Sequence, residues 1–159
     1  MAKSPPKKKR FEYNLQSVLE YRLDCESKEQ ERFIRADQAY REELAKEEAL
    51  KHQEMMAHQG LLEELAMGKI IDFQQIGMRR AHLEQLKVEI EEQVAVRIEA
   101  EEKKNEQHKV LIQAMKDRKI LEEDKEKKHN LWKKMMKKEE LKFLDEVATL
   151  GFVRKTKDA

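Results

Sequence analysis

Two long stretches of this sequence contain almost no helix-breaking residue. Residues 15–59 hold neither glycine nor proline, and residues 73–150 hold no proline and one glycine, Gly77. The chain is rich in Glu, Lys, Leu, Ala, Arg and Gln, which are strong helix formers. Hydrophobic residues make up 39% of the chain but aromatic residues only 6%, so a thick core of several layers is not expected. We therefore predict an elongated all-α protein that buries one narrow apolar stripe.

Start signals for two helices are present in the sequence. Asn14 is suited to an N-cap, because its side chain can accept a hydrogen bond from a free backbone N–H of the first turn. Tyr13 and Val18 occupy the positions of a hydrophobic staple around it. Asp72 with Gln75 resembles a capping box. These signals predict two helices, the first beginning near residue 14 and the second near residue 72.

Stop signals complete the predicted organisation. Gly68 and Gly151 suit the position just after a helix end. The prediction is a flexible basic tail at 1–13, a single coiled-coil domain at 14–150 with helices near 14–66 and 72–149 and a turn at 67–71, and a frayed end at 151–159. Because the turn is short, the helices must run antiparallel, as a hairpin whose second helix is the longer.

Apolar residues recur along both helices at intervals of three, four and seven, but strict heptads are not sustained. We therefore expect a loose supercoil. With the turn centred near Lys69, Leu44 should face Val94 and Asn14 should face roughly Asp124. The second helix would then continue for its last turns with no partner in the chain.

That predicted overhang is amphipathic. Residues 125–142 carry eight basic and three acidic residues, whereas residues 12–66 carry 14 acidic and seven basic ones. The apolar residues expected to be uncovered are Leu131, Trp132, Met135, Met136, Leu141, Phe143, Leu144 and Val147. This mixture favours docking into a protein partner over binding to nucleic acid, and a merely solvated helix end is a third interpretation.

Catalysis is not predicted. The five histidines are scattered without a zinc-binding spacing, and the single cysteine, Cys25, is interpreted as a small apolar residue of the helix seam. No Gly-rich phosphate loop is present, so we expect no metal, no cofactor and no enzymatic activity. The basic run at residues 5–10 resembles a nuclear import signal, but a disordered basic tail, able to touch an anionic membrane surface, is the favoured interpretation. The absence of an apolar run of about 20 residues predicts a cytoplasmic protein.

Three segments resemble one protein family. Residues 11–22 follow the pattern F-x-x-x-L-x-x-V-L-x-x-R, residues 83–93 have spaced apolar residues ahead of a glutamine, and residues 140–148 end in D-E-V-A with Arg154 beyond. In order and spacing, over nearly the whole chain, they resemble FliJ-type flagellar export proteins. The tail at residues 1–10 is less typical of that family.

The resemblance implies a role in bacterial flagellum biogenesis, and so in motility and chemotaxis. FliJ-type proteins are stalk-like antiparallel coiled coils that hydrolyse nothing. They bind the hexameric flagellar export ATPase, the cytoplasmic domain of the export gate and export chaperones, so the chain is expected at the cytoplasmic face of the inner membrane, associated peripherally. Candidate ATPase contacts lie near both chain ends: Leu15, Val18, Leu19, Arg22, Trp132, Met135, Met136, Phe143, Leu144 and Val147. Candidate gate contacts are Tyr40, Leu44, Leu86, Ile90 and Gln93.

Two alternatives from other functional classes remain open at the level of sequence. One is a free-standing coiled-coil scaffold, which a neighbouring gene for a rotary-type ATPase would argue against. The other is a basic helical nucleic-acid-binding protein, which would bind DNA or RNA with a steep salt dependence.

Overall fold

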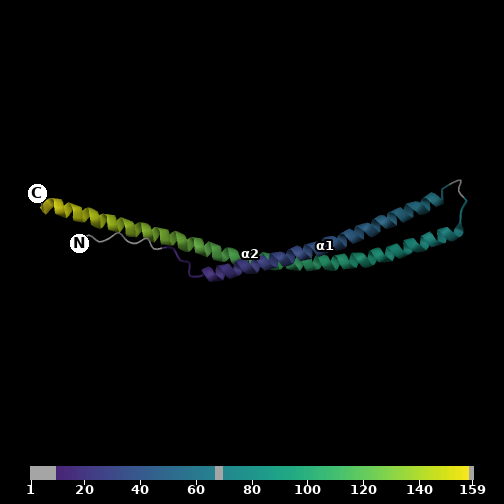
Figure 1. Ribbon diagram of the computed structural model, residues 1–159, viewed down its shortest axis with the longest axis horizontal. Helices are drawn as coiled ribbons and strands as arrows, with labels where there is room; N and C mark the ends of the chain where they lie inside the picture. The colour runs from purple at the N-terminus through teal and green to yellow at the C-terminus, as the bar shows by residue number, and fades with distance from the viewer. Residues whose placement is uncertain (1–9, 67–69, 158–159) are drawn as a thin grey trace. The chain divides into compact units, whose positions relative to one another are not determined.

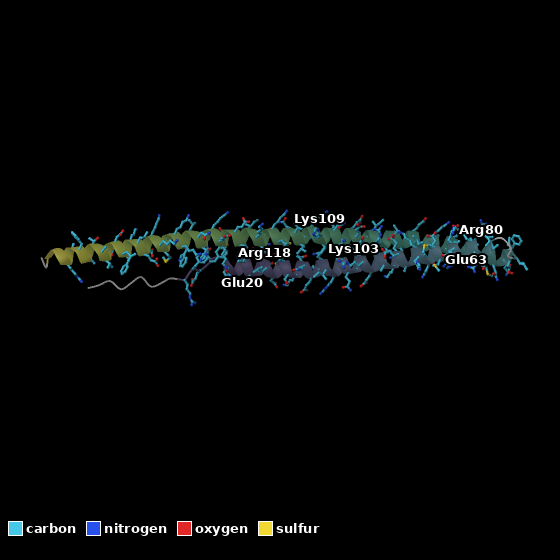
Figure 2. The ribbon with its side chains drawn as sticks, turned by 90° about the horizontal axis from the view of Figure 1, so that it is seen from above. Glu20, Glu63, Arg80, Lys103, Lys109 and Arg118 are labelled. Carbon is cyan, nitrogen blue, oxygen red and sulfur yellow. The ribbon has the colours of Figure 1, made fainter. Side chains whose placement is uncertain are left out.

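The protein consists of two long α-helices. The computed structural model describes residues 10–66 and 70–157, and in them it contains α1 (Gln16–Glu64) and α2 (Phe73–Lys157) and no strand (Figure 1). The all-α prediction with a longer second helix is confirmed. Within these residues, neither helix has a stretch long and apolar enough to span a membrane. Charged side chains project from both helices (Figure 2).

Contacts divide the chain into two units, each of which contains part of both helices. The inner unit is Glu26–Gln113, and the terminal unit contains the described residues of Met1–Cys25 and Ala114–Ala159. Side-chain hydrogen bonds in the inner unit join three successive pairs, Glu29 with Gln107, Glu43 with Gln93, and Glu64 with Arg79. The partner number falls as the α1 number rises, so the helices of this unit are antiparallel. The contact of Glu43 with Gln93 agrees with the predicted register.

The buried and half-buried residues of the inner unit recur with a regular spacing. On α1 they include positions 29, 33, 36, 40, 43 and 47, and on α2 positions 83, 86, 90, 93, 97, 100, 104 and 107. Both series alternate steps of three and four, which is the spacing of a coiled-coil seam. Polar residues occupy many of these positions, so the apolar residues alone do not display the heptad repeat. This is why the sequence predicted that strict heptads are not sustained.

The two helix starts differ in how well the sequence predicted them. Asp72 caps α2, since its Oδ1 accepts hydrogen bonds from the backbone N–H groups of Gln74 at 2.9 Å and Gln75 at 3.4 Å. Asn14 does not cap α1. The helix begins at Gln16, and Asn14 Oδ1 instead lies 3.5 Å from Lys128 Nζ. The reason is that the adjacent Tyr13 is buried against α2, which holds residues 13–15 in a turn before the helix starts.

The predicted end of the second helix is also corrected. The helix does not stop at residue 149 but continues through Gly151 to Lys157. A glycine inside a helix costs about 1 kcal/mol relative to alanine, which weakens a helix without ending it, and no proline follows. The proposed C-cap Gly68 at the turn, the tail at residues 1–9 and the last residues 158–159 lie outside the described residues.

Candidate partner-binding site

Residues 10–15 precede α1 as a non-helical segment held against α2. We call this segment the strap. Tyr13 anchors it: the side chain is only 7% exposed, and its hydroxyl lies 2.8 Å from Asp124 Oδ2 and 3.3 Å from the Leu121 carbonyl oxygen. Lys128 Nζ lies 2.8 Å from the same carboxylate and 5.3 Å from the centre of the Tyr13 ring. The strap is therefore fixed to α2 by burial, hydrogen bonding and charge.

The same contacts shift two pKa values in opposite directions. Burial first, and then the neighbouring Asp124 carboxylate, raises the pKa of the Tyr13 hydroxyl. The hydrogen bond from Lys128, followed by that from Tyr13, lowers the pKa of Asp124. The carboxylate is thus held ionised as the acceptor to which the strap is tied.

An aromatic cluster lies at the outer end of the strap. The Phe11 ring centre is 4.9 Å from that of His129 and 5.9 Å from that of Trp132, and the His129 and Trp132 rings are stacked. The predictions that residues 10–13 belong to a flexible tail and that Trp132 has no partner in the chain are therefore wrong. Aromatic residues at 11 and 13, separated by one polar residue, were the available signal, because that alternation places both on one side of an extended segment.

The α1 candidates for ATPase contact differ in accessibility. Leu19 is buried and Leu15 half-buried, whereas Val18 is exposed. Arg22 is occupied by an ion pair with Asp117, with an N–O distance of 3.1 Å. Leu19 and Arg22 thus hold the two helices of the terminal unit together, and Val18 is the accessible member of the set.

The α2 candidates begin at the outer end of the strap, where Trp132 meets Phe11, and the others follow along α2. Trp132, Met136 and Phe143 are half-buried, and Met135, Leu144 and Val147 are exposed. At 100° per residue, positions 132, 136, 143, 147 and 150 share one side of the helix. This is also the side on which Leu121 and Lys125 meet the strap and the start of α1. The face that α2 uses for packing within the chain therefore continues to Leu150.

Comparison with known proteins decides the family. The family model described as Flagellar FliJ protein matches residues 10–157, nearly the whole chain. The chain belongs to the FliJ family. It is accordingly a component of the flagellar export apparatus, and the resemblance seen in its sequence is confirmed. Neither a curated protein nor a solved structure matches the chain.

The gate-contact candidates of this FliJ-family chain lie at or beside the seam of the inner unit. Leu86 is 2% exposed, and Leu44 and Ile90 are half-buried. Lys104 Nζ lies 4.2 Å from the centre of the Tyr40 ring, and the Gln93 amide donates to Glu43. Tyr40, Leu86 and Gln93 thus have roles in packing α1 against α2, and Leu44 and Ile90 are partly covered.

The FliJ-family chain shows no arrangement suited to metal binding in the described residues. No group of three or more His, Cys, Asp or Glu side chains lies close enough there to hold a metal ion. Cys25 is half-buried and has a free thiol.

Proposed function

We propose that this protein is the stalk-like coiled coil that binds the flagellar export ATPase hexamer through the end of α2, without catalysing a reaction itself. In this proposal the chain also binds the cytoplasmic domain of the export gate and export chaperones. It works in the cytoplasm, peripherally at the inner membrane. Membership of the FliJ family supports the proposal, since these are the partners expected of such stalks.

One observation carries the assignment of the ATPase-binding end. The packing face of α2 continues past Trp132 through Met136, Phe143, Val147 and Leu150, which are left partly or largely exposed. Burying a large apolar side chain contributes about 1.5–3 kcal/mol. A partner that covers several of them gains affinity even after the entropic cost of association. The uncovered face is thus suited to a helix-in-groove contact.

Charge supports the same assignment. Lys133, Lys134, Lys137 and Lys138 are exposed and lie among the apolar residues of this end. Four ammonium groups on two helical turns attract an acidic surface and accelerate association, and added salt weakens the effect. We therefore expect the opening of the ATPase ring that receives α2 to be acidic.

The gate contact is proposed with a narrower set of residues than the sequence indicated. Leu86 is too buried to touch a partner while the helices are paired, so it supports the seam instead. Tyr40, Leu44, Ile90 and Gln93 are half-buried and present edges to solvent. We propose that any gate contact in this region uses those edges.

Truncation after Trp132 tests the ATPase-binding end. The shortened chain keeps the strap and its contacts with Asp124, His129 and Trp132, so it should fold as the full chain does. It loses the uncovered face and should neither bind nor stimulate the cognate ATPase. Circular dichroism checks the fold, and a pull-down with an ATPase assay measures the function. Full stimulation by the shortened chain would show that this end of α2 is not the ATPase contact.

A pair of point variants makes the test specific to one face. Phe143→Ser removes an apolar side chain from the packing face. Leu141→Ser is the matched control, because Leu141 lies about half a turn from that face at 100° per residue and is exposed. We expect Phe143→Ser to weaken ATPase binding about tenfold and Leu141→Ser to leave it unchanged. Equal losses in the two variants would mean that the helix end is recognised without regard to face.

A further inference from the structure

The residues that fill the seam of the inner unit are apolar near the turn and largely polar farther from it. Near the ends of the helices that approach the turn, Leu61, Leu83 and Leu86 are buried and form apolar layers. Between residues 26 and 57 of α1, by contrast, the one buried residue is a glutamate, Glu47. The apolar packing is therefore concentrated at one end of this unit. Hydrogen bonds and ion pairs are prominent in the remainder of the seam.

Two Glu–Gln contacts of the same kind lie within that remainder. The Gln93 amide donates to Glu43 Oε2 at 2.6 Å and to the Glu43 carbonyl oxygen at 3.1 Å. The Gln107 amide donates to Glu29 Oε2 at 2.5 Å and to the Glu29 carbonyl oxygen at 3.5 Å. The two contacts are separated by 14 residues on each helix, or two heptads. They specify one register, since sliding either helix by one heptad would break both.

Buried charge lies at one end of this stretch. Glu47 is 5% exposed and accepts from Lys51 Nζ and Arg97 Nε, both at 2.6 Å. Arg97 also pairs with Glu101 at 2.8 Å. The hydrogen bond from Lys51 is the main cause of a lowered pKa for Glu47, and that from Arg97 adds to it, against the opposing effect of burial. Glu47 is thus an ionised carboxylate within the seam.

Between the two Glu–Gln contacts and just beyond Gln107, the α2 side of the inner unit is also polar. Lys104 lies 3.7 Å from Asp37 and over the ring of Tyr40, and the Phe33 ring packs on the imidazole of His108 rather than on an apolar residue. Across the seam, the charged groups that α1 contributes are carboxylates, whereas α2 contributes amides, an ammonium and a guanidinium. Lys51 and Glu101 form their ion pairs within their own helices.

The energetics of the two parts of the seam differ. Burial of leucine side chains stabilises a helix pair directly. Charged pairs at a seam lose hydration when they form, so their net contribution is small even when the distances are short. Segments with few buried apolar contacts are the ones that open locally at low free energy. The Glu–Gln and ion-pair stretch should accordingly open more readily than the leucine layers.

We propose that residues 29–47 of α1 and 93–107 of α2 form a polar joint, a segment of the hairpin that separates and re-forms while the layers around Leu61, Leu83 and Leu86 stay closed. The complementary chemistry of the two sides returns the helices to one register. Pairing α1 with another copy of α1 would bring carboxylates together, so re-closure favours α2, and the closed leucine layers keep α2 of the same chain alongside. The joint thereby provides local motion without loss of register.

Hydrogen–deuterium exchange of the full chain tests the joint. Backbone amides of 29–47 and 93–107 should exchange about tenfold faster or more than those of 57–64 and 83–90. The double variant Glu47→Leu with Arg97→Leu replaces the buried pair with apolar side chains. It should slow exchange in the joint and reduce that difference. The comparison of exchange rates between the two regions of the parent chain needs no variant, so it tests the proposal even if the double variant folds poorly.

An exposed pair in the same part of α2 provides the control. Glu99 and Lys103 form an ion pair at 2.6 Å within the helix, and both side chains are exposed. Glu99→Gln with Lys103→Gln should leave the exchange rates of the joint unchanged. Equal protection of the joint and the leucine layers in the parent chain would overturn the proposal. So would a Glu47→Leu, Arg97→Leu variant that folds but exchanges as the parent does.

Discussion

Single side chains at the start of the chain decide where α1 begins. Tyr13 is buried and its hydroxyl is bound to Asp124, so the segment before Gln16 follows α2 instead of entering a helix. The Phe11 ring then reaches His129 and Trp132. Aromatic rings that meet at such distances stabilise one another beyond the area they bury. The strap is therefore part of the folded terminal unit.

The contact of Phe11 with Trp132 can be tested by fluorescence, because Trp132 is the only tryptophan. Phe11→Ala removes a ring whose centre lies 5.9 Å from the indole. Water then gains access to the indole, and the emission should shift to longer wavelength with helix content unchanged. Glu12→Ala, at an exposed neighbour in the strap, is the control and should leave the spectrum as it is. An unchanged spectrum for Phe11→Ala would mean that the strap does not cover Trp132.

At the scale of the element, α2 is continuous over 85 residues although two glycines lie inside it. A Cβ added at Gly77 or Gly151 would meet nothing within 4 Å. Gly60 of α1 differs, because an added Cβ would lie 3.0 Å from Arg79 Nη1, and Arg79 pairs with Glu64 at 2.6 Å. Gly60 is thus near a contact between the helices, whereas Gly77 and Gly151 only lower helix propensity.

Gly151→Ala should therefore strengthen the end of α2. Replacing a glycine inside a helix by alanine favours the helical state by about 1 kcal/mol. Amide exchange of residues 148–154 should slow about fivefold, a change that proton-exchange NMR can resolve. Gly60→Ala is a contrasting variant, since its gain in propensity is opposed by displacement of the Arg79 guanidinium. Faster exchange at 148–154 in Gly151→Ala would argue against a helix that passes through this position.

At the scale of the whole molecule, acidic and basic residues are distributed unevenly along the chain. Residues 12–66 have an excess of acidic groups, whereas residues 125–142 have an excess of basic ones. Carboxylates in both units have lowered pKa values. The first cause is a hydrogen bond from Lys46 for Glu43, from Lys51 for Glu47 and from Lys128 for Asp124. Ionised carboxylates thus contribute to stability in each unit separately.

Stability should consequently fall in acid. A carboxyl group whose pKa is lower in the folded state than in the unfolded state stabilises the fold above its ordinary pKa, and that contribution is lost as the pH falls through the folded value. For Glu43 and Glu47 the loss begins at about 4.5 and continues below it. The melting temperature followed by circular dichroism should fall as the pH is lowered below 4.5. Glu47→Gln should show a shallower decline, and a melting temperature that rises in acid would contradict the assignment.

The sequence by itself determined the elements of this fold. Helix propensity, the lack of proline and the Asp72 cap are local properties, and local hydrogen bonding within one turn is enough to express them. The short connection then predicts antiparallel pairing, and the register near Glu43 and Gln93 follows from counting outward from the turn. Of the residues predicted to overhang, Leu131, Met135, Leu141, Leu144 and Val147 are exposed, whereas Trp132 is covered by the strap.

The tertiary structure alone decided which residues form the seam and where α1 starts. Several heptad positions are occupied by Glu47, Gln93, Arg97 and Lys104, which the sequence alone presents as solvated polar residues. They become seam residues only because the facing helix supplies a partner for each. In the same way, α1 starts later than the sequence predicts because the Tyr13 hydroxyl donates a hydrogen bond to Asp124, more than 100 residues away. Burial of a polar group depends on its partner across the interface, and a pattern read along one helix does not contain that partner.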